Sequence, residues 1–183
     1  MATHCLVSAR FESMDLQIRV LTEKDAGELF RLRCQSLLAA PEVFLASPGD
    51  DLVSSEDAAR ELLMRGGDAA VFGAFADGLQ GMLGLYRATH LKSAHKIHLW
   101  GMFVLPQWRR RGVGGALLHA AIAHARTLPG VSSVHLGVSG AAPAARRLYE
   151  RAGFTVWGVE REAIRLDGRS FDEHHMVMRV SAD

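Results

Sequence analysis

Hydrophobic and polar residues change their spacing several times along the 183-residue chain, and each change marks a predicted element. Residues 16–21 alternate between the two classes, which predicts a strand. A stripe of leucines at helical spacing follows, and Thr22 with Asp25 forms a capping-box-like start for that helix. A loop with Pro41 and Pro48 then leads to a second predicted helix around residues 55–65, which two glycines end.

The next segments predict mainly strands. Apolar runs flank Asp77-Gly78, a pair typical of a tight hairpin turn, and residues 95–105 form a further apolar run. A glycine-rich stretch and an alanine-rich helix follow, and "SSVHLGVS" then reads as a short buried strand. "APAARRLYERAG" predicts a helix, and two long strands joined at Asp167-Gly168 complete the chain.

The predicted order is β-α-α-β-β-β-α-β-α-β-β, which indicates one α/β domain with a mixed sheet and helices on its faces. We assign residues 16–183 to this domain. Residues 1–15 have no clear period and are expected to form a flexible arm.

Composition narrows the class of protein. Hydrophobic residues make up 49% and charged residues 22%, and the net charge of +1 argues against a general nucleic-acid binder. The only two cysteines, Cys5 and Cys34, give neither a disulfide framework nor a metal site. We find no signal peptide and no continuous apolar span, so we expect a cytoplasmic protein without a membrane partner. The histidine spacings predict no metal either.

The stretch "VLPQWRRRGVGGALLHAAIAHA" combines dense positive charge with three glycines at the start of a helix. Glycine brings backbone N–H groups close to a ligand, and a helix N-terminus favours an anion. The P-loop pattern fails here because no Lys-Ser/Thr follows, and the dinucleotide pattern would need glycine at Leu117. An ordinary glycine-rich turn beside a solvated basic run is the alternative.

Two segments together resemble one family. "MFVLPQWRRRGVGGALL" resembles the acetyl-CoA-binding motif of the GNAT superfamily of N-acetyltransferases, with its Arg/Gln-x-x-Gly-x-Gly/Ala signature at residues 109–114. "VSGAAPAARRLYERAGF" resembles the strand and helix that follow, with Leu148-Tyr149 and Gly153-Phe154 at the helix end. The likeness extends over about residues 17–180. It implies a mostly antiparallel seven-stranded sheet, about four helices, and two central parallel strands that splay around acetyl-CoA.

The resemblance also implies a reaction: transfer of an acetyl group to a primary amine of a small molecule or a protein, by direct attack in a ternary complex. The pantetheine arm would bond the backbone of one splayed strand, and the diphosphate would bind the amides from Arg111 to Ala116. Gly101 could permit a bulge that supplies an oxyanion donor. The family often has asparagine where this chain has Ala142. The expected acetyl-CoA residues are Met102, Phe103, Val104, Arg109, Arg110, Arg111, Gly112, Val113, Gly114, Gly115, Ala116, Ser139, Ala142, Ala145 and Tyr149.

Tyr149 is the candidate general acid, because a tyrosine is protonated at neutral pH and can donate to a departing thiolate. A core tyrosine with a purely structural hydroxyl is the alternative. His98 is a candidate general base, and the glutamates of the last strands, at 160, 162 and 173, are further possibilities that the sequence does not rank.

The acceptor would lie against the first two helices, their loop and the last hairpin, with walls that include Phe30, Arg33, Phe44 and Trp100. Asp50-Asp51 in the intervening loop could attract an amine. Two other classes stay open: a non-catalytic acyl-CoA-binding regulator of the same fold, and an RNA-binding module, against which the near-neutral charge argues. The last strands could also pair two subunits into a homodimer.

Overall fold

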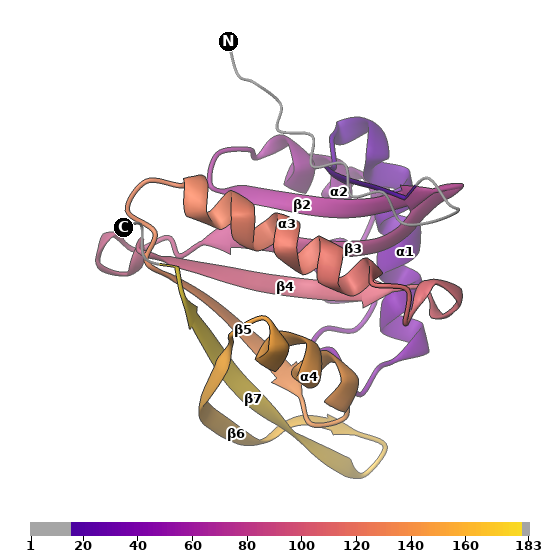
Figure 1. The fold of residues 1–183 in the computed structure, drawn as a ribbon. Helices are drawn as coiled ribbons and strands as arrows, with labels where there is room; N and C mark the ends of the chain where they lie inside the picture. Colours follow the sequence, from indigo (N-terminus) through magenta and orange to yellow (C-terminus); the bar gives the residue numbers. More distant parts are fainter. Residues whose placement is uncertain (1–15, 181–183) are drawn as a thin grey trace.

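The strands of the computed structural model, which describes residues 16–180, pair in the order β1-β2-β3-β4-β5-β7-β6 (Figure 1). Every neighbouring pair is antiparallel except β4 with β5. This mixed sheet of seven strands confirms the predicted α/β class and element order. Residues 1–15, predicted as an arm, lie outside the described residues. The strands are β1 (Gln17–Val20), β2 (Ala69–Ala76), β3 (Gly78–Arg87), β4 (Lys96–Val104), β5 (Ser133–Ser139), β6 (Thr155–Leu166) and β7 (Arg169–Arg179).

Four α-helices cover the two faces of the sheet, with α3 and α4 on one face and α1 and α2 behind it (Figure 1). The helix predicted from Thr22 begins as a short 3-10 turn, in which the Thr22 amide donates to the Asp25 carboxylate over 2.7 Å. Among the described residues, no helix combines the length and apolar character needed to cross a bilayer. The helices are α1 (Ala26–Ala39), α2 (Glu56–Met64), α3 (Val113–Thr127) and α4 (Pro143–Arg151).

Each face of the sheet has its own hydrophobic core. On one face, Leu117 and Ala121 of α3 pack on Val134 and Met176, and all four are fully buried. On the other, Leu29 of α1 packs in a second cluster that includes Met82 and Phe103. Burial of this apolar surface on both sides holds the central strands in place and fixes their side-chain alternation.

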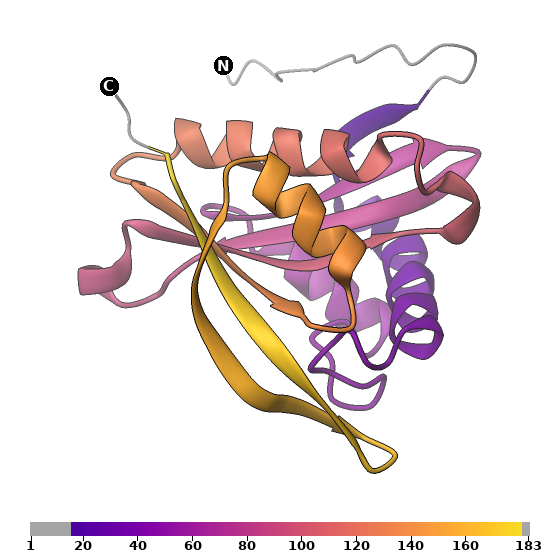
Figure 2. The same ribbon diagram turned by 60° about the horizontal axis from the view of Figure 1, so that its bottom comes forward.

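The parallel pair β4–β5 stays together only at one end. Its register contains Lys96 opposite Ser133, Ile97 opposite Val134, and His98 opposite His135. Beyond this point β4 continues to Val104 and β5 to Ser139, but the two strands no longer pair with each other, so a gap opens between them (Figure 2). The strands therefore splay as the sequence resemblance predicted.

A β-bulge interrupts β4 at the start of this gap. Trp100 lies opposite Gly84 and Phe103 opposite Met82, so two residues of β4 face the single residue Leu83 of β3. One of the two is Gly101, whose φ of 66° lies in the left-handed region that glycine tolerates. The bulge predicted at Gly101 is therefore present.

Candidate active site

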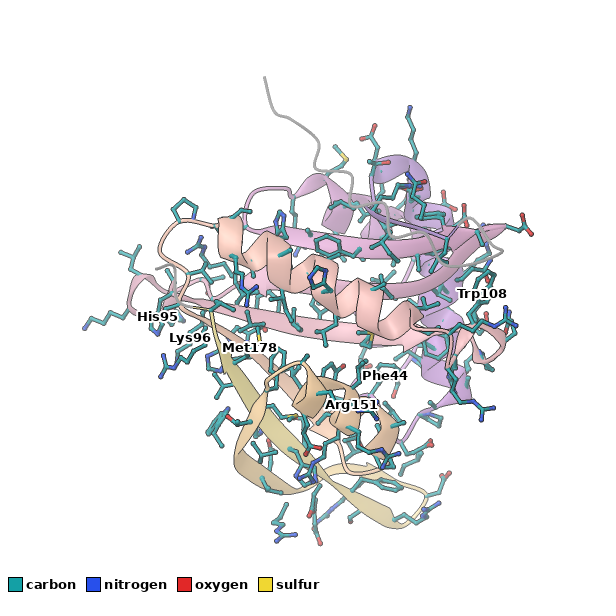
Figure 3. The ribbon with its side chains drawn as sticks, in the orientation of Figure 1. Phe44, His95, Lys96, Trp108, Arg151 and Met178 are labelled. Carbon is teal, nitrogen blue, oxygen red and sulfur yellow. The ribbon has the colours of Figure 1, made fainter. Side chains whose placement is uncertain are left out.

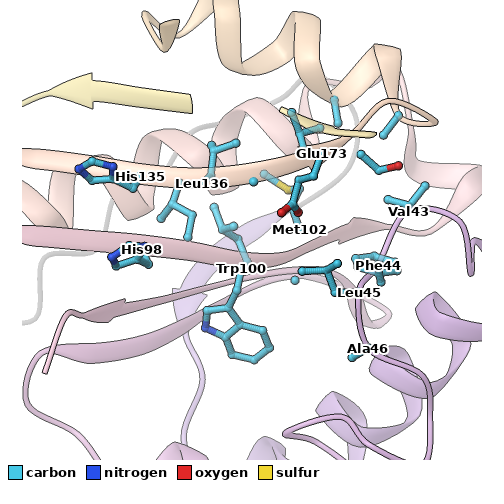
Figure 4. A pocket seen from close by; sticks show the side chains of 18 of the residues that line it. Val43, Phe44, Leu45, Ala46, His98, Trp100, Met102, His135, Leu136 and Glu173 are labelled. Carbon is cyan, nitrogen blue, oxygen red and sulfur yellow. The ribbon is translucent and has the colours of Figure 1, made fainter. Parts of the chain in front are cut away.

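A cavity of about 480 Å³ occupies the gap between the splayed strands (Figure 4). Its wall combines β4 and β5 with α1, the loop after α1, α4 and the last hairpin. Most of the predicted catalytic and acceptor-site side chains meet here. The lining includes Arg33, Phe44, Asp50, Asp51, His98, Trp100, Gly101, Met102, His135, Ser139, Ala142, Ala145, Tyr149, Trp157 and Glu173.

The glycine-rich loop forms the start of α3. Gly112, with φ of 80°, is the residue that precedes the helix, so a side chain there would be strained. The next three amides, from Val113 to Gly115, belong to the first turn and have no partner within the helix. The Ala116 amide, predicted as a further donor to the anion, already donates to the Gly112 carbonyl over 3.0 Å and is therefore not available to a ligand.

The three arginines of the signature have separate surroundings. Arg109 is exposed but donates from Nε to the Val104 carbonyl over 2.9 Å, so it fastens the loop to the end of β4. The guanidinium carbon of Arg111 lies 5.4 Å from the ring centroid of Trp108. Arg110 is exposed, and its backbone φ is 60°. In Figure 3 Trp108 lies at the opposite end of the sheet from His95, which precedes β4.

Gly114 has a second role beside backbone access. A Cβ atom on Gly114 would lie 3.3 Å from the side chain of Leu148, so the lack of a side chain at this position lets α3 approach α4 closely. The first turn of α3 and the helix that carries Tyr149 are thereby held against each other.

Tyr149 lies on α4 with only 6% of its surface exposed, and it lines the cavity. Its ring packs edge-on against Phe154 at the helix end, with 6.0 Å between centroids. Burial raises the pKa of the Tyr149 hydroxyl above its ordinary value, because the phenolate would lose its hydration. The hydroxyl therefore stays protonated at neutral pH and can act as a hydrogen-bond donor.

The small residues predicted to contact acetyl-CoA line the cavity at the start of α4, but one is already engaged. Ser139 donates its hydroxyl proton to the Glu42 carbonyl over 2.8 Å and accepts from the Ala141 amide over 3.1 Å. This hydroxyl joins β5 to the loop after α1, so it positions the cavity wall. Ala142 and Ala145 leave room beside it.

His98 lies at the end of the cavity where β4 and β5 are still paired. Its ring stacks on Tyr86 at 5.2 Å and lies 5.5 Å from the ring of His135. Burial and the charge of Lys96 lower the pKa of His98, and burial with neighbouring positive charge lowers that of His135 to about 4. Both rings are therefore neutral at pH 7, and His98 is a weaker base than a solvated histidine.

Glu173 lies nearer the open part of the gap, and Figure 4 shows its carboxylate pointing into the cavity above Trp100. Its side chain is 13% exposed and packs over Gly137, where a Cβ atom would lie only 2.5 Å from the carboxyl group. Burial raises the pKa of Glu173; the neighbouring His175 opposes this shift, and the negative charge of Glu160 adds to it. Glu160 and Glu162 are exposed, so the structure separates the three glutamates that the sequence did not rank.

The strand register of the last hairpin also brings Glu160, Glu173 and His175 together. Their side-chain ligand atoms all lie within 4.8 Å of one another, a grouping that could hold a metal ion. His175 Nε2 lies 3.2 Å from Glu160 and 4.0 Å from Glu173. Ligand spacing along the chain does not reveal this group, because it is the pairing of β6 with β7 that places Glu160 opposite Glu173.

A buried ion pair forms the wall under the bulge. Arg33 of α1 holds Asp51 through Nε and Nη2, with a shortest distance of 2.7 Å, and the two side chains are 5% and 4% exposed. The guanidinium lies 4.7 Å from the ring centroid of Phe44 and 5.8 Å from that of Trp100. Phe30, predicted in the same wall, instead packs against the core cluster on the α1 side and does not line the cavity.

Trp100 takes its position because Gly84 has no side chain. A Cβ atom on Gly84 would lie 2.0 Å from the indole, which therefore rests directly on the backbone of β3. The indole also borders a second cavity of about 790 Å³ beneath α2, so it separates the two spaces.

Several solved structures with the same architecture are described as acetyltransferases. The chain superposes with a TM-score of 0.80 on the acetyltransferase of the GNAT family from Streptococcus pneumoniae, at 22% identity, covering 91% of this chain and 99% of that one. The yncA protein of Salmonella typhimurium, solved with its cofactor acetyl-CoA, gives 0.78 at 18% identity over 92% and 95%. The ribosomal-protein-S18-alanine N-acetyltransferase of Escherichia coli gives 0.69 at 19% over 92% and 96%. At such identities the likeness is one of fold.

Sequence comparison agrees. A segment of 55 residues is 44% identical to mycothiol acetyltransferase of Nocardiopsis dassonvillei, covering 30% of this chain and only 16% of that protein. The model of the acetyltransferase (GNAT) family matches residues 34–154, which is well over half of the chain. Together with the splayed strands and the glycine-rich start of α3, this match shows that the chain belongs to the GNAT family of acetyltransferases.

Proposed function

We propose that the protein is an acetyl-CoA-dependent N-acetyltransferase that acts on a primary amine. The observation that carries this proposal is the meeting of two groups in one cavity between splayed strands. A buried tyrosine that stays protonated, Tyr149, lines it from α4, and a buried carboxylate of raised pKa, Glu173, lines it from β7.

The residues present fit acetyl-CoA. The unpaired amides of Val113, Gly114 and Gly115 suit a diphosphate, because a helix N-terminus offers N–H donors and partial positive charge. The facing edges of β4 beyond His98 and of β5 beyond His135 suit an extended amide chain, since no ladder between described residues joins them there. When bound, acetyl-CoA supplies the acetyl group as a reactive thioester.

The chain's own groups would then orient and polarise the reaction. The bulge at Gly101 takes β4 out of its regular ladder with β3 and leaves a backbone N–H available to a carbonyl oxygen that gains charge. Phe44 and Trp100 wall the same space with aromatic surface.

Proton movement would use the two buried groups. The Glu173 carboxylate attracts the acceptor's ammonium group and takes its proton, which leaves the amine nitrogen free to attack. The Tyr149 hydroxyl donates to the departing thiolate sulfur. Glu173 suits the base role better than His98 by position, because its carboxylate points into the open part of the gap, whereas His98 lies where β4 and β5 are still paired (Figure 4).

The test is an acceptor screen with purified protein and acetyl-CoA, following release of the CoA thiol and the mass of each product. We expect an amine-dependent thiol release with a mass gain of one acetyl group on the amine. Cofactor binding without any acetyl transfer across amino acids, amino-acid amides, diamines and peptides would instead favour the non-catalytic regulator.

A further inference from the structure

One buried donor in the cavity wall has no hydrogen-bond partner among residues 16–180. Arg33 uses Nε and Nη2 for Asp51, but Nη1 has no hydrogen-bond partner among the described residues although the side chain is 5% exposed. A buried guanidinium N–H without an acceptor costs stability, because its hydration is lost and not replaced. Such a group is typical of a site that a ligand completes.

The position of Nη1 tells where that ligand atom would lie. Nη1 lies 3.6 Å from the point that a Cβ atom on Gly101 would occupy, so it is directly beside the bulge of β4. If the proposed function holds, the acceptor amine attacks at this bulge. A ligand atom that reaches Nη1 would then belong to the acceptor, within two or three bonds of its nitrogen.

The charges around the cavity decide the type of atom. Among the described residues that line it, the carboxylates of Asp50, Asp51 and Glu173 outnumber the one guanidinium, that of Arg33. Lowered pKa values keep His98 and His135 neutral at pH 7, and His175 lies beside the carboxylates of Glu160 and Glu173. The Asp51 carboxylate already neutralises the guanidinium of Arg33 through a bidentate ion pair. A free carboxylate on the acceptor would therefore meet excess negative charge, whereas an uncharged carbonyl oxygen would not.

We infer that Arg33 Nη1 receives an amide carbonyl oxygen next to the acceptor amine, so the substrate is an α-amino amide. Amino-acid amides and the first residue of a peptide share this chemistry: a cationic nitrogen for Glu173 and a neutral oxygen for Arg33. This inference deepens the proposed function and rests on it for the place of attack.

The test compares L-leucinamide, L-leucine and isoamylamine, which share one side chain and differ only beside the amine. Steady-state kcat/KM is divided by the unprotonated fraction of each amine at the assay pH. Calorimetry with the protein–CoA complex, which cannot react, measures binding of the same three compounds. We expect leucinamide to exceed the other two about tenfold in both measurements, the size of one hydrogen bond to a charged group.

Arg33→Lys keeps a cation for Asp51 but removes Nη1, and Arg31→Lys on the exposed side of the same helix is its matched control. Arg33→Lys should abolish the preference for leucinamide, whereas Arg31→Lys should retain it. Equal binding of all three compounds to the unaltered protein, a preference for leucine, or an equal loss with every acceptor in Arg33→Lys would overturn the inference. Binding that discriminates without any acetyl transfer would instead reject the proposed reaction and keep the assignment of Arg33. A leucine-initiated dipeptide distinguishes peptides from free amides.

Discussion

Burial raises the pKa of two side chains in the cavity, and the consequence differs between them. For Tyr149 the shift moves ionisation further from neutral pH, so the hydroxyl remains a donor. For Glu173 the shift moves the carboxyl group toward neutral pH, where it can both take and release a proton. The same desolvation thus suits Tyr149 to the proposed role of acid and Glu173 to that of base.

Removing the tyrosine hydroxyl tests the acid role. Tyr149→Phe should lower kcat by about 100-fold, since a positioned acid contributes on that order, while the dissociation constant for acetyl-CoA stays unchanged. Stopped-time assays and calorimetry on the same preparation measure the two quantities. If kcat is unchanged, Tyr149 serves packing against Phe154 and nothing more.

Glu173→Gln tests the base. In the unaltered protein kcat/KM should rise with pH as the carboxyl group ionises, and this acidic limb should lie above the range of an ordinary glutamate because the pKa is raised. The variant should lose about 100-fold in kcat/KM at neutral pH, and the limb should disappear. A limb that persists in the variant would move the base elsewhere, with His98 as the first candidate.

The same variant has an opposite effect on stability. A raised pKa in the folded state means that the folded protein binds more protons than the unfolded chain, so stability falls as pH rises through that window. At neutral pH the ionised, buried carboxylate therefore costs stability. Glu173→Gln should raise the melting temperature at pH 7 and leave it nearly unchanged at pH 3. A lower melting temperature at pH 7 would mean that the carboxylate makes stabilising contacts.

At the scale of elements, the bulge in β4 depends on one glycine. Gly101→Ala introduces a side chain at a φ of 66°, 3.2 Å from Met82, and should lower the free energy of unfolding by about 1–2 kcal/mol. Gly49→Ala, where nothing lies within 4 Å and φ is not left-handed, is the control. Denaturant titration measures both, and equal stabilities would show that the bulge does not need glycine.

The loop after α1 is attached to the sheet by polar groups that form the cavity wall. Asp51→Ala would leave the Arg33 guanidinium buried and unpaired, so we expect a loss of about 3–5 kcal/mol in the free energy of unfolding. Asp57→Ala breaks an exposed pair with Arg60 and should cost less than about 1 kcal/mol. Similar losses for the two variants, again from denaturant titration, would contradict a special role for the buried pair.

Elements with a strong local signal were predictable from the sequence. The hairpin at Asp77-Gly78 and the helix around residues 55–65 follow from a turn signal and from the two glycines that end the helix, and both form close to the predicted residues. The bulge at Gly101 was predicted because a glycine interrupts an apolar strand that the resemblance placed at the reaction centre.

The contacts between distant elements were not predictable. Glu173 is distinguished from Glu160 and Glu162 only by the register of β5, β6 and β7, which places it over Gly137. The engagement of Ser139 with Glu42 likewise joins residues 97 positions apart. The local sequence pattern carries no information on such pairings. The proposed base, the residues of the cavity wall and the position of Phe30 outside that wall could therefore be found only from the structure.

At the scale of the whole molecule, the sheet has one place where its two halves separate, and every proposed role is arranged around it. Strands β1 to β4 with α1 and α3 lie on one side of the gap, and β5 to β7 with α4 lie on the other (Figure 1). Tyr149 and Glu173 come from the second half, whereas the bulge and Arg33 come from the first. A ligand in the gap would therefore touch both halves.

The measurement that tests this arrangement most directly is calorimetric titration of acetyl-CoA into the protein and into a folded Gly112→Trp, Gly114→Trp variant. The two indoles would fill the start of α3 and the space against Leu148. We predict saturable binding at one site per chain in the unaltered protein, and none in the variant, whose fold is checked by circular dichroism. No binding to the unaltered protein, or equal binding to the folded variant, would contradict an acetyl-CoA site at the glycine-rich loop.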